Sequence, residues 1–320
     1  MKRIGVVTAG GDAPGMNAAI RAVVRSAIYH NLEVVGIERG YAGLIEGRCR
    51  VLDRRSVSGI INLGGTILRT VRCKEMMTDE GINKAAEFLK SIDVDGLVAI
   101  GGDGTFRGAS RLYEASGISM IGVPATIDND VSGTDTTIGF DTAVNVALDA
   151  IDKIRDTATS HERIFVVEVM GRRRGLLALE VGLAGGAEII LIPEIKFDSD
   201  KIYERIKRDR EEGKLSEIIV MAEGAGDSRL VTEHIARKTG YEVRLTVLGH
   251  IQRGGAPTAR SRVLACQFGN KAVELLATGE RKRMVGIRGE KVVSVDLDYS
   301  WRVKKKIDLS RYRLAEILSL

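Results

Sequence analysis

The segment Pro124–Asp130 (PATIDND) carries a hydroxyl and two carboxylates at alternate positions. If the segment is extended, Thr126, Asp128 and Asp130 point to one side and share one cleft. A carboxylate in such a cleft can accept a proton from a substrate hydroxyl, as the catalytic aspartate of protein kinases does. Capping of a turn or helix is the ordinary alternative, above all for Asp130.

A second motif, Ile100–Gly108 (IGGDGTFRG), places one carboxylate within a glycine-rich turn. Asp103 could bind Mg²⁺, which usually takes one or two carboxylates together with phosphate oxygens. Gly108 would leave room for a flat base or a ribose. The pattern is moderately specific for a nucleotide kinase, and a tight turn without a ligand is the alternative.

A third glycine-rich segment, Thr8–Asn17 (TAGGDAPGMN), stands between an apolar run and a helical pattern. Glycines let backbone N–H groups approach an anion, and the start of a helix adds partial positive charge. The segment is neither the dinucleotide fingerprint nor a Walker loop. By itself it predicts a tight turn as readily as a phosphate site.

Arginines could supply the other half of a phosphoryl-transfer site, because the transition state spreads negative charge over oxygens that need fixed donors. Arg172 and Arg253 stand out because each adjoins a glycine-rich turn near an apparent strand end. A single arginine is more often part of a surface ion pair. The candidates are Arg72, Arg163, Arg172, Arg244 and Arg253.

Short apolar runs precede these motifs, and such runs are typical of buried parallel strands. The alternation of strand and helix patterns predicts an α/β fold, with mostly parallel sheets and crossover helices. Ligands of such sheets bind beyond the carboxyl ends of strands, where the three motifs stand. We expect strands at 1–7, 32–37, 95–100, 120–123, 164–170 and 218–222, and helices at 16–30, 139–160, 257–277 and, on the surface, 301–320.

The composition excludes several classes of protein. The 320 residues are 44% hydrophobic and carry a net charge of +5, which rules out a disordered chain. Aromatic residues are only 4% and the basic residues form no single run, so we expect no nucleic-acid partner. No apolar run is long enough for a membrane span or a secretory signal. Three scattered cysteines without a CxxC pair indicate reduced thiols and a cytoplasmic protein.

The three motifs together, in this order and spacing, resemble those of the bacterial type of ATP-dependent 6-phosphofructokinase. The resemblance runs from Met1 to about residue 290. It includes the matching stretches 149–158, 160–163, 222–224 and 249–255. Each glycine turn alone is a weak signal, whereas the whole set is highly specific.

The resemblance implies transfer of the γ-phosphoryl group of ATP to the 1-hydroxyl of fructose 6-phosphate. It implies that Asp128 is the catalytic base, with Asp130 in the same motif, and that Thr126 and Arg172 stabilise the transferring group. In this family Arg163 and Arg244 reach the sugar phosphate from a neighbouring subunit, which implies a homotetramer. The implied substrate-binding residues are Thr126, Asp128, Arg163, Met170, Gly171, Arg172, Glu223, Arg244, His250 and Arg253.

The resemblance also implies a Mg²⁺ cofactor at Asp103, an ATP site, and an effector site for ADP or phosphoenolpyruvate. Glu212 stands where many relatives have an effector-site arginine, so this chain departs from the family pattern at that position. For Arg21 and Arg25, the alternative to effector binding is an ordinary solvated helix face. The ATP-site residues are Gly11, Tyr41, Arg72, Cys73, Gly102, Asp103, Gly104, Thr105 and Gly108. The effector residues are Arg21, Arg25, Arg54, Arg155, Glu188 and Lys214.

Two Rossmann-like three-layer domains follow from the resemblance, with residues 1–139 and 252–301 binding ATP and residues 140–251 and 302–320 binding fructose 6-phosphate. The main alternative is a pyrophosphate-dependent phosphofructokinase. Such relatives carry lysine at the position of Ala125 and a second aspartate at the position of Gly104, so ATP is favoured. Another kinase with a Gly-Gly-Asp-Gly turn, or a catalytically silent sugar-phosphate sensor, are more distant alternatives.

Overall fold

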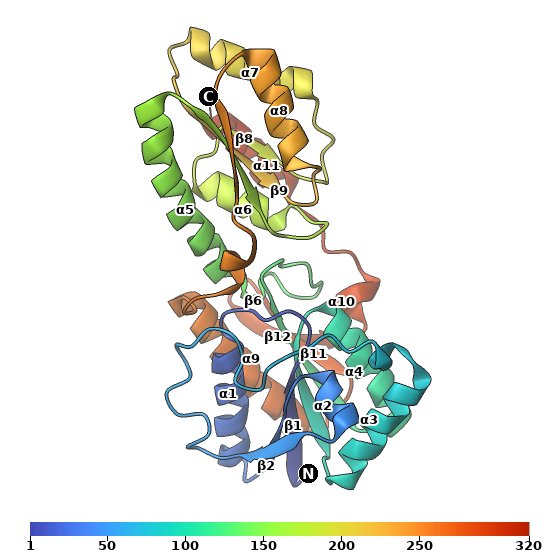
Figure 1. The fold of residues 1–320 in the computed structure, drawn as a ribbon. Coiled ribbons are helices and arrows are strands. Elements are labelled where there is room, and N and C mark those ends of the chain that lie inside the picture. Colours follow the sequence, from blue (N-terminus) through green and yellow to red (C-terminus); the bar gives the residue numbers. More distant parts are fainter. Residues whose placement is uncertain (320) are drawn as a thin grey trace. The chain divides into compact units, whose positions relative to one another are not determined.

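A computed structural model describes residues 1–319 and divides them into two compact units (Figure 1). The first unit comprises Met1–Thr142 and Arg253–Lys305. The second comprises Ala143–Gln252 and the segment from Lys306 onward. Each unit is therefore built from two separate stretches of chain. These boundaries lie a few residues from those expected, and the ligand that each unit binds remains a prediction.

The first unit contains an eight-stranded sheet in the order β12-β11-β5-β4-β1-β2-β3, with β6 paired to β5. The inner strands are parallel, whereas β3 and β12 are antiparallel to their neighbours. The strands are β1 (Arg3–Thr8), β2 (Glu33–Ile37), β3 (Cys49–Leu52), β4 (Gly96–Gly101), β5 (Ser119–Thr126), β6 (Ile138–Gly139), β11 (Arg283–Arg288) and β12 (Lys291–Asp296).

Helices cover both faces of this sheet. Figure 1 shows α1 and α9 side by side along one face and α3 and α4 along the other. Val7, Leu97 and Phe106 are fully buried in the core between the sheet and α4. The helices are α1 (Met16–Tyr29), α2 (Tyr41–Glu46), α3 (Asp79–Ser91), α4 (Asp103–Ser116), α9 (Ala259–Ala277) and α10 (Tyr299–Arg302), with a 3₁₀ turn η1 at Glu75–Met77.

The second unit contains a parallel four-stranded sheet in the order β10-β7-β9-β8. Apolar residues of α7 and α8, among them Ile206 and Ile235, pack on one face, and α5 and α6 lie over the other (Figure 1). The strands are β7 (Ile164–Val169), β8 (Ile189–Leu191), β9 (Glu217–Ala222) and β10 (Val243–Val247). The helices are α5 (Phe140–His161), α6 (Leu176–Ala184), α7 (Ser199–Glu211), α8 (Ser228–Thr239) and α11 (Leu309–Leu318), with a 3₁₀ turn η2 at Gly249–Arg253. The start of α5, up to Thr142, and the last residue of η2, Arg253, belong to the first unit.

The expected fold class is confirmed, since each unit is a mostly parallel sheet flanked by helices. The strand expected at 120–123 continues through Pro124 to Thr126. Pro124 is in register with Gly101 of β4 and lies beyond Ile121 and Gly122, the residues at which β11 pairs with β5. Among the described helices, none combines the length and the hydropathy needed to cross a bilayer.

The expectation of one surface helix over 301–320 was wrong. The tail contains α10 and α11, separated by a non-helical segment at 303–308. Within that segment the Lys305 ammonium donates to the Asn129 side chain at 2.8 Å and to the Asp135 carbonyl at 3.0 Å. Asp308 then caps α11 by accepting from the backbone N–H of Ser310 at 2.9 Å. These contacts hold the backbone away from a continuous helix.

The packing of α1 against α9 generates a stability prediction. A Cβ at Gly269 would lie 2.6 Å from Cβ of Ala22 and 2.9 Å from the carbonyl oxygen of Ala19. We therefore expect Gly269→Leu to force the helices apart and to lower the free energy of unfolding by about 2 kcal/mol, in spite of the gain of about 1 kcal/mol in helix propensity.

Urea denaturation measures this effect, and Gln267→Leu on the exposed side of α9 is the control. The control should change the free energy of unfolding by no more than about 0.5 kcal/mol. Equal effects of the two substitutions would contradict the close approach of the helices.

Candidate active site

Two glycine-rich loops are joined at the carboxyl ends of β1 and β4. The backbone N–H of Ala9 donates to the Ile100 carbonyl at 3.0 Å, and the buried Thr105 hydroxyl donates to the Ala9 carbonyl at 2.8 Å. A Cβ at Gly101 would lie 2.3 Å from that hydroxyl and 2.4 Å from that carbonyl. Only glycine fits there, so the first and second motifs form one rigid platform.

The second and third motifs also adjoin. Strands β4 and β5 pair up to Gly101 and Pro124, and a Cβ at Gly102 would lie 3.8 Å from Cβ of Thr126. Gly102 is the N-cap residue of α4, and Asp103 is the first residue of that helix. The parallel pairing therefore brings the predicted metal ligand and the predicted catalytic segment to one edge of the sheet.

The surroundings of Asp103 fit a Mg²⁺ ion carried by a nucleotide. Its carboxylate accepts from the backbone N–H of Gly104 at 2.7 Å and lies 3.6 Å from the Arg107 guanidinium. The side chain is 37% exposed, and nothing lies within 4 Å of a Cβ built on Gly104. Residues 1–319 contain no cluster of three or more metal-binding side chains. One carboxylate with phosphate oxygens is an ordinary ligand set for Mg²⁺.

The third motif was expected to be extended, with Thr126, Asp128 and Asp130 on one side, but the extended conformation ends with β5 at Thr126. The chain bends at Ile127 and Asp128, and Asn129 has a φ of 51°, in the left-handed region. The backbone N–H of Asp128 donates to the Thr126 hydroxyl at 3.2 Å, which stabilises the bend. Asp128 is only 1% exposed, whereas Asp130 is partly exposed.

Side chains from distant segments hold this bend. The Thr137 hydroxyl donates to the Thr126 carbonyl at 2.6 Å, and the Asn129 amide donates to the Asp135 carbonyl at 3.2 Å. Lys305, as described above, binds Asn129 from the tail. Sequence reasoning missed Thr137 and Lys305, since neither belongs to a motif.

Tyr41 and Gly108 pack against each other. A Cβ at Gly108 would lie 2.6 Å from the Tyr41 ring, so this glycine makes room for a side chain of the protein rather than for the base or ribose first considered. The Tyr41 hydroxyl donates to the Thr105 carbonyl. Burial raises the pKa of Tyr41 well above its usual value, so the ring is an uncharged wall.

Arg253 lies against the first glycine loop. Its guanidinium donates to the Asp12 carbonyl at 3.1 Å, and a Cβ at Gly11 would lie 2.6 Å from one of its nitrogens. Arg253 was predicted to bind the sugar phosphate, and it belongs to the first unit. Two of the predicted nucleotide-site residues, the exposed Arg72 and the half-buried Cys73, follow Thr70, whose hydroxyl donates to the Gly10 carbonyl at 2.9 Å. The predicted ATP-site residues thus all belong to the first unit.

In the second unit, the loop after β7 is held by the loop after β9. The backbone N–H of Arg172 donates to the Glu223 carboxylate. Arg172 has a φ of 53°, and a Cβ at Gly224 would lie 2.2 Å from its carbonyl oxygen. Nearby, the backbone N–H of Met170 donates to the buried Gln252 side chain at 2.9 Å. Four predicted substrate residues, Met170, Gly171, Arg172 and Glu223, are therefore brought together.

Arg163 and Arg244 share one carboxylate. The Arg163 guanidinium donates to Glu242 at 2.6 Å, and the Arg244 guanidinium pairs with the other oxygen of the same group. Hydrogen bonding by Arg163 holds the pKa of Glu242 below its usual value. Arg163 and Arg244, both expected at one sugar phosphate, thus lie together around the carboxylate of Glu242.

His250, another predicted substrate residue, is exposed in η2.

Three of the predicted effector residues form a cluster. Glu188 accepts from the backbone N–H of Ile218 at 2.7 Å and lies 3.5 Å from Arg155 and 3.3 Å from Lys214. Arg155 also donates to the carbonyls of Gly185 and Gly186 at 2.7 and 2.9 Å. The other three belong to the first unit: Arg21 and Arg25 on α1, and Arg54 in the exposed segment after β3.

Beside this cluster lies an acid that sequence reasoning missed. Glu217 is fully buried at the start of β9, and its carboxylate oxygens accept no hydrogen bond from the residues that the structure describes. Burial, and then the nearby Asp209 and Glu188, raise its pKa to about 7. Nothing in the sequence distinguishes this glutamate from the many exposed ones.

Comparisons with known proteins bear on these sites. A family model described as phosphofructokinase matches residues 3–276. Proteins named ATP-dependent 6-phosphofructokinase are similar over the full length of both chains, with 57% identity over 320 residues in Halalkalibacterium halodurans and 55% over 332 in Halothermothrix orenii. The solved phosphofructokinase of Pichia pastoris in the T-state matches with a TM-score of 0.87 and 37% identity, covering 93% of this chain and 35% of that one.

A pyrophosphate-dependent phosphofructokinase from Marinobacter aquaeolei also matches in structure. Its TM-score is 0.86 at 24% identity, with 97% of this chain and 86% of that chain covered. At this identity the match shows the fold alone.

The burial of Glu217 predicts a stability that falls with pH. An acid whose pKa rises from 4.5 to about 7 on folding binds more protons in the folded than in the unfolded chain between those pH values. The free energy of unfolding therefore decreases as pH rises through this range. We expect Glu217→Gln to remove this decrease and to gain about 2–3 kcal/mol relative to the original chain between pH 5 and pH 8.

Urea unfolding at the two pH values measures the gain. Glu212→Gln, at the exposed end of α7, is the matched control. Its free energy of unfolding, relative to that of the original chain, should be the same at pH 5 and pH 8. If the free energies of unfolding of Glu217→Gln and of the original chain differ by the same amount at both pH values, the proposed ionisation of the buried Glu217 is refuted.

Proposed function

The chain belongs to the phosphofructokinase family, and on that premise we propose that it transfers the γ-phosphoryl group of ATP to the 1-hydroxyl of D-fructose 6-phosphate. The products are fructose 1,6-bisphosphate and ADP. The observation that supports this most is the meeting of the three motifs at one edge of the first sheet, through the contacts of Thr105 with Ala9 and of Gly102 with Thr126. Phosphoryl transfer depends chiefly on such positioning.

Asp128 is the proposed base. The 1-hydroxyl oxygen forms a bond to the γ-phosphorus, the bond from that phosphorus to the bridging oxygen of ADP breaks, and the hydroxyl proton passes to Asp128. An aspartate of ordinary pKa, near 3.9, is a weak base for an alcohol. It can still take the proton late in a loose transition state, so its fixed position in the bend after β5 matters more than its basicity.

The remaining residues of the proposed site would bind the nucleotide, orient the phosphoryl group and neutralise its charge. Asp103 would hold Mg²⁺, which, bound with ATP, neutralises charge on the phosphate oxygens. Thr126 and Arg172 would stabilise the transferring phosphoryl group by hydrogen bonding and charge. The uncharged Tyr41 ring and the glycine loops would form walls of the nucleotide site.

ATP rather than pyrophosphate is the proposed donor. Ala125 is buried in β5, and Gly104 stands where pyrophosphate-dependent relatives carry an aspartate. Steady-state turnover of fructose 6-phosphate with ATP and with pyrophosphate, measured side by side, tests the proposal. Turnover with pyrophosphate alone would contradict it.

We further propose a cytoplasmic homotetramer regulated by ADP and phosphoenolpyruvate. Arg163 and Arg244 would then serve the sugar phosphate of a neighbouring subunit. Arg155, Glu188 and Lys214 would form part of the effector site, together with Arg21, Arg25 and Arg54. The cluster around Glu188 supports this, because it gathers two cations at a buried anion. Kinetics with and without each effector, and the mass in solution, test these points.

Asp128→Asn tests the proposed base. The amide keeps the shape of the side chain but cannot accept the proton, so kcat should fall by roughly 10²-fold or more, with KM for fructose 6-phosphate nearly unchanged. A coupled assay of ADP release measures both constants. A kcat within a few-fold of that of the original chain would remove Asp128 from this role.

Arg163→Ala and Arg244→Ala test the paired arginines. Each removes one charge-assisted contact to the sugar phosphate, so KM for fructose 6-phosphate should rise by about 10-fold or more, while KM for ATP stays the same. Arg237→Ala, exposed near the end of α8, is the control. Unchanged KM values in both variants would exclude the pair from substrate binding.

A further inference from the structure

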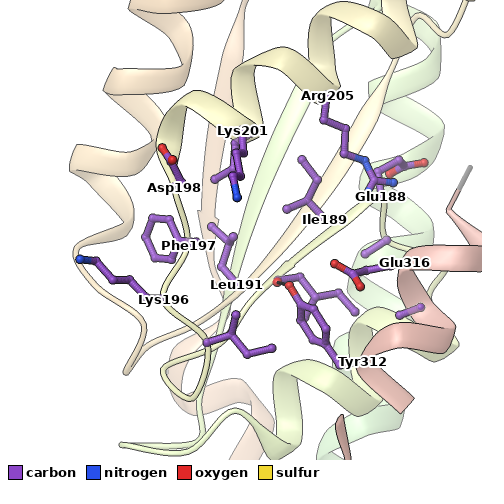
Figure 2. A pocket seen from close by; sticks show the side chains of 15 residues that line it. Glu188, Ile189, Leu191, Lys196, Phe197, Asp198, Lys201, Arg205, Tyr312 and Glu316 are labelled. Atoms are coloured by element: carbon purple, nitrogen blue, oxygen red, sulfur yellow. Dashed lines mark hydrogen bonds between the residues drawn. The ribbon is translucent and has the colours of Figure 1, made fainter. Parts of the chain in front are cut away.

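The second unit contains a cavity outside the residues proposed for catalysis. It has a volume of about 300 Å³ and lies between β8, the start of α7 and α11 (Figure 2). Ile189, Leu191 and Phe197 form an apolar wall, and Tyr312 closes the cavity from α11. A volume at the low end of the range for ligand pockets suits a small molecule.

The cavity is held open by contacts that fix α11. The Tyr312 hydroxyl donates to the Ile190 carbonyl at 3.1 Å. The Arg205 guanidinium donates to the carbonyl and hydroxyl of Ser319 at 3.0 and 2.6 Å, and Arg311 pairs with Glu180 at 2.6 Å. A ligand would therefore meet a preformed wall and would not have to order the helix.

Two exposed side chains of opposite charge line the cavity and pair with none of the described residues. Figure 2 shows the Lys201 ammonium and the Glu316 carboxylate turned toward the cavity from opposite walls. Neither side chain forms a hydrogen bond or ion pair within residues 1–319.

The other charged groups of the lining are already engaged or turned away. Glu188 is paired with Arg155 and Lys214. Asp198 caps α7 by accepting from the backbone N–H of Asp200 at 2.9 Å. Arg205 binds Ser319 and lies 3.7 Å from Asp209, and Lys196 points away from the cavity in Figure 2.

We propose that this cavity binds a small zwitterion with an apolar side group, of the size of a free amino acid. The anionic end pairs with Lys201, the cationic end pairs with Glu316, and the side group packs on Ile189, Leu191 and Phe197. Both side chains are exposed, so a ligand with a single charge would pair with only one of them and would form one charge-assisted contact fewer than a zwitterion. Such a site would be separate from both the proposed active site and the proposed effector cluster, apart from the shared wall residue Glu188.

Three probes with the same ring test the charge requirement: L-phenylalanine, phenylacetate and phenethylamine. Calorimetric titration of the full chain should give a Kd of about 1 mM for phenylalanine, the affinity of a fragment-sized ligand. The two singly charged probes should bind at least about 10-fold more weakly, because each lacks one charge-assisted contact. Equal binding of phenylacetate would overturn the zwitterion, and no binding of phenylalanine up to about 10 mM would overturn the site.

Variants locate the binding. Lys201→Met and Glu316→Gln should each weaken phenylalanine binding by about 10-fold. Lys207→Met, farther along α7 and exposed, should leave the binding unchanged. Turnover of fructose 6-phosphate without phenylalanine should be the same in all three variants, which shows that they fold and separates this test from that of the proposed activity. Binding that survives both Lys201→Met and Glu316→Gln would place phenylalanine elsewhere and refute the assignment.

Discussion

The hydrogen bond from the buried Thr105 hydroxyl to the Ala9 carbonyl is the contact on which the candidate active site depends. It ties the start of α4 to the loop after β1, and it is possible only because residue 101 has no Cβ. Parallel pairing of β4 with β5 up to Gly101 and Pro124 then brings Gly102 next to Thr126. Gly101 is therefore needed mainly because a side chain there would clash with the Thr105 hydroxyl and the Ala9 carbonyl, and less because a ligand must enter.

Strands β1, β2, β4, β5, β7 and β9, helices α1, α5 and α9, and the positions of the three motifs could be predicted from local patterns of apolar residues and glycine. Strand β11 and helices α3, α4, α7 and α8 were not predicted. The edge strands β3 and β12 could not be predicted, since their residues are mostly exposed or half-buried and lack a continuous apolar run. The bend at Asp128 was also missed. Its conformation is set by Thr137 and by Lys305, which is 176 residues from Asn129, and spacing within a motif says nothing about such contacts.

The two buried glutamates of the second unit show why charge is equally hard to read from a sequence. Glu188 directly precedes β8, Glu217 begins the neighbouring strand β9, and both are at least 90% buried. Glu188 pairs with Arg155 and Lys214 and accepts from a backbone N–H, whereas Glu217 accepts no hydrogen bond from the described residues and has its pKa raised by burial and then by Asp209 and Glu188. The difference arises from the direction of each side chain relative to helices that come from other parts of the chain, so it appears only in three dimensions.

The contacts around Asp128 distinguish the residue proposed to react from the residues that hold it in position. Asp128 is buried within a bend that its own motif determines only in part, and further contacts to that bend come from Thr137 and Lys305. Because phosphoryl transfer gains more from position than from basicity, a loop fixed from two sides suits a residue proposed as the base. The tail that was expected to be a plain surface helix therefore has a specific task in the first unit, which is to fix Asn129 next to the proposed catalytic carboxylate.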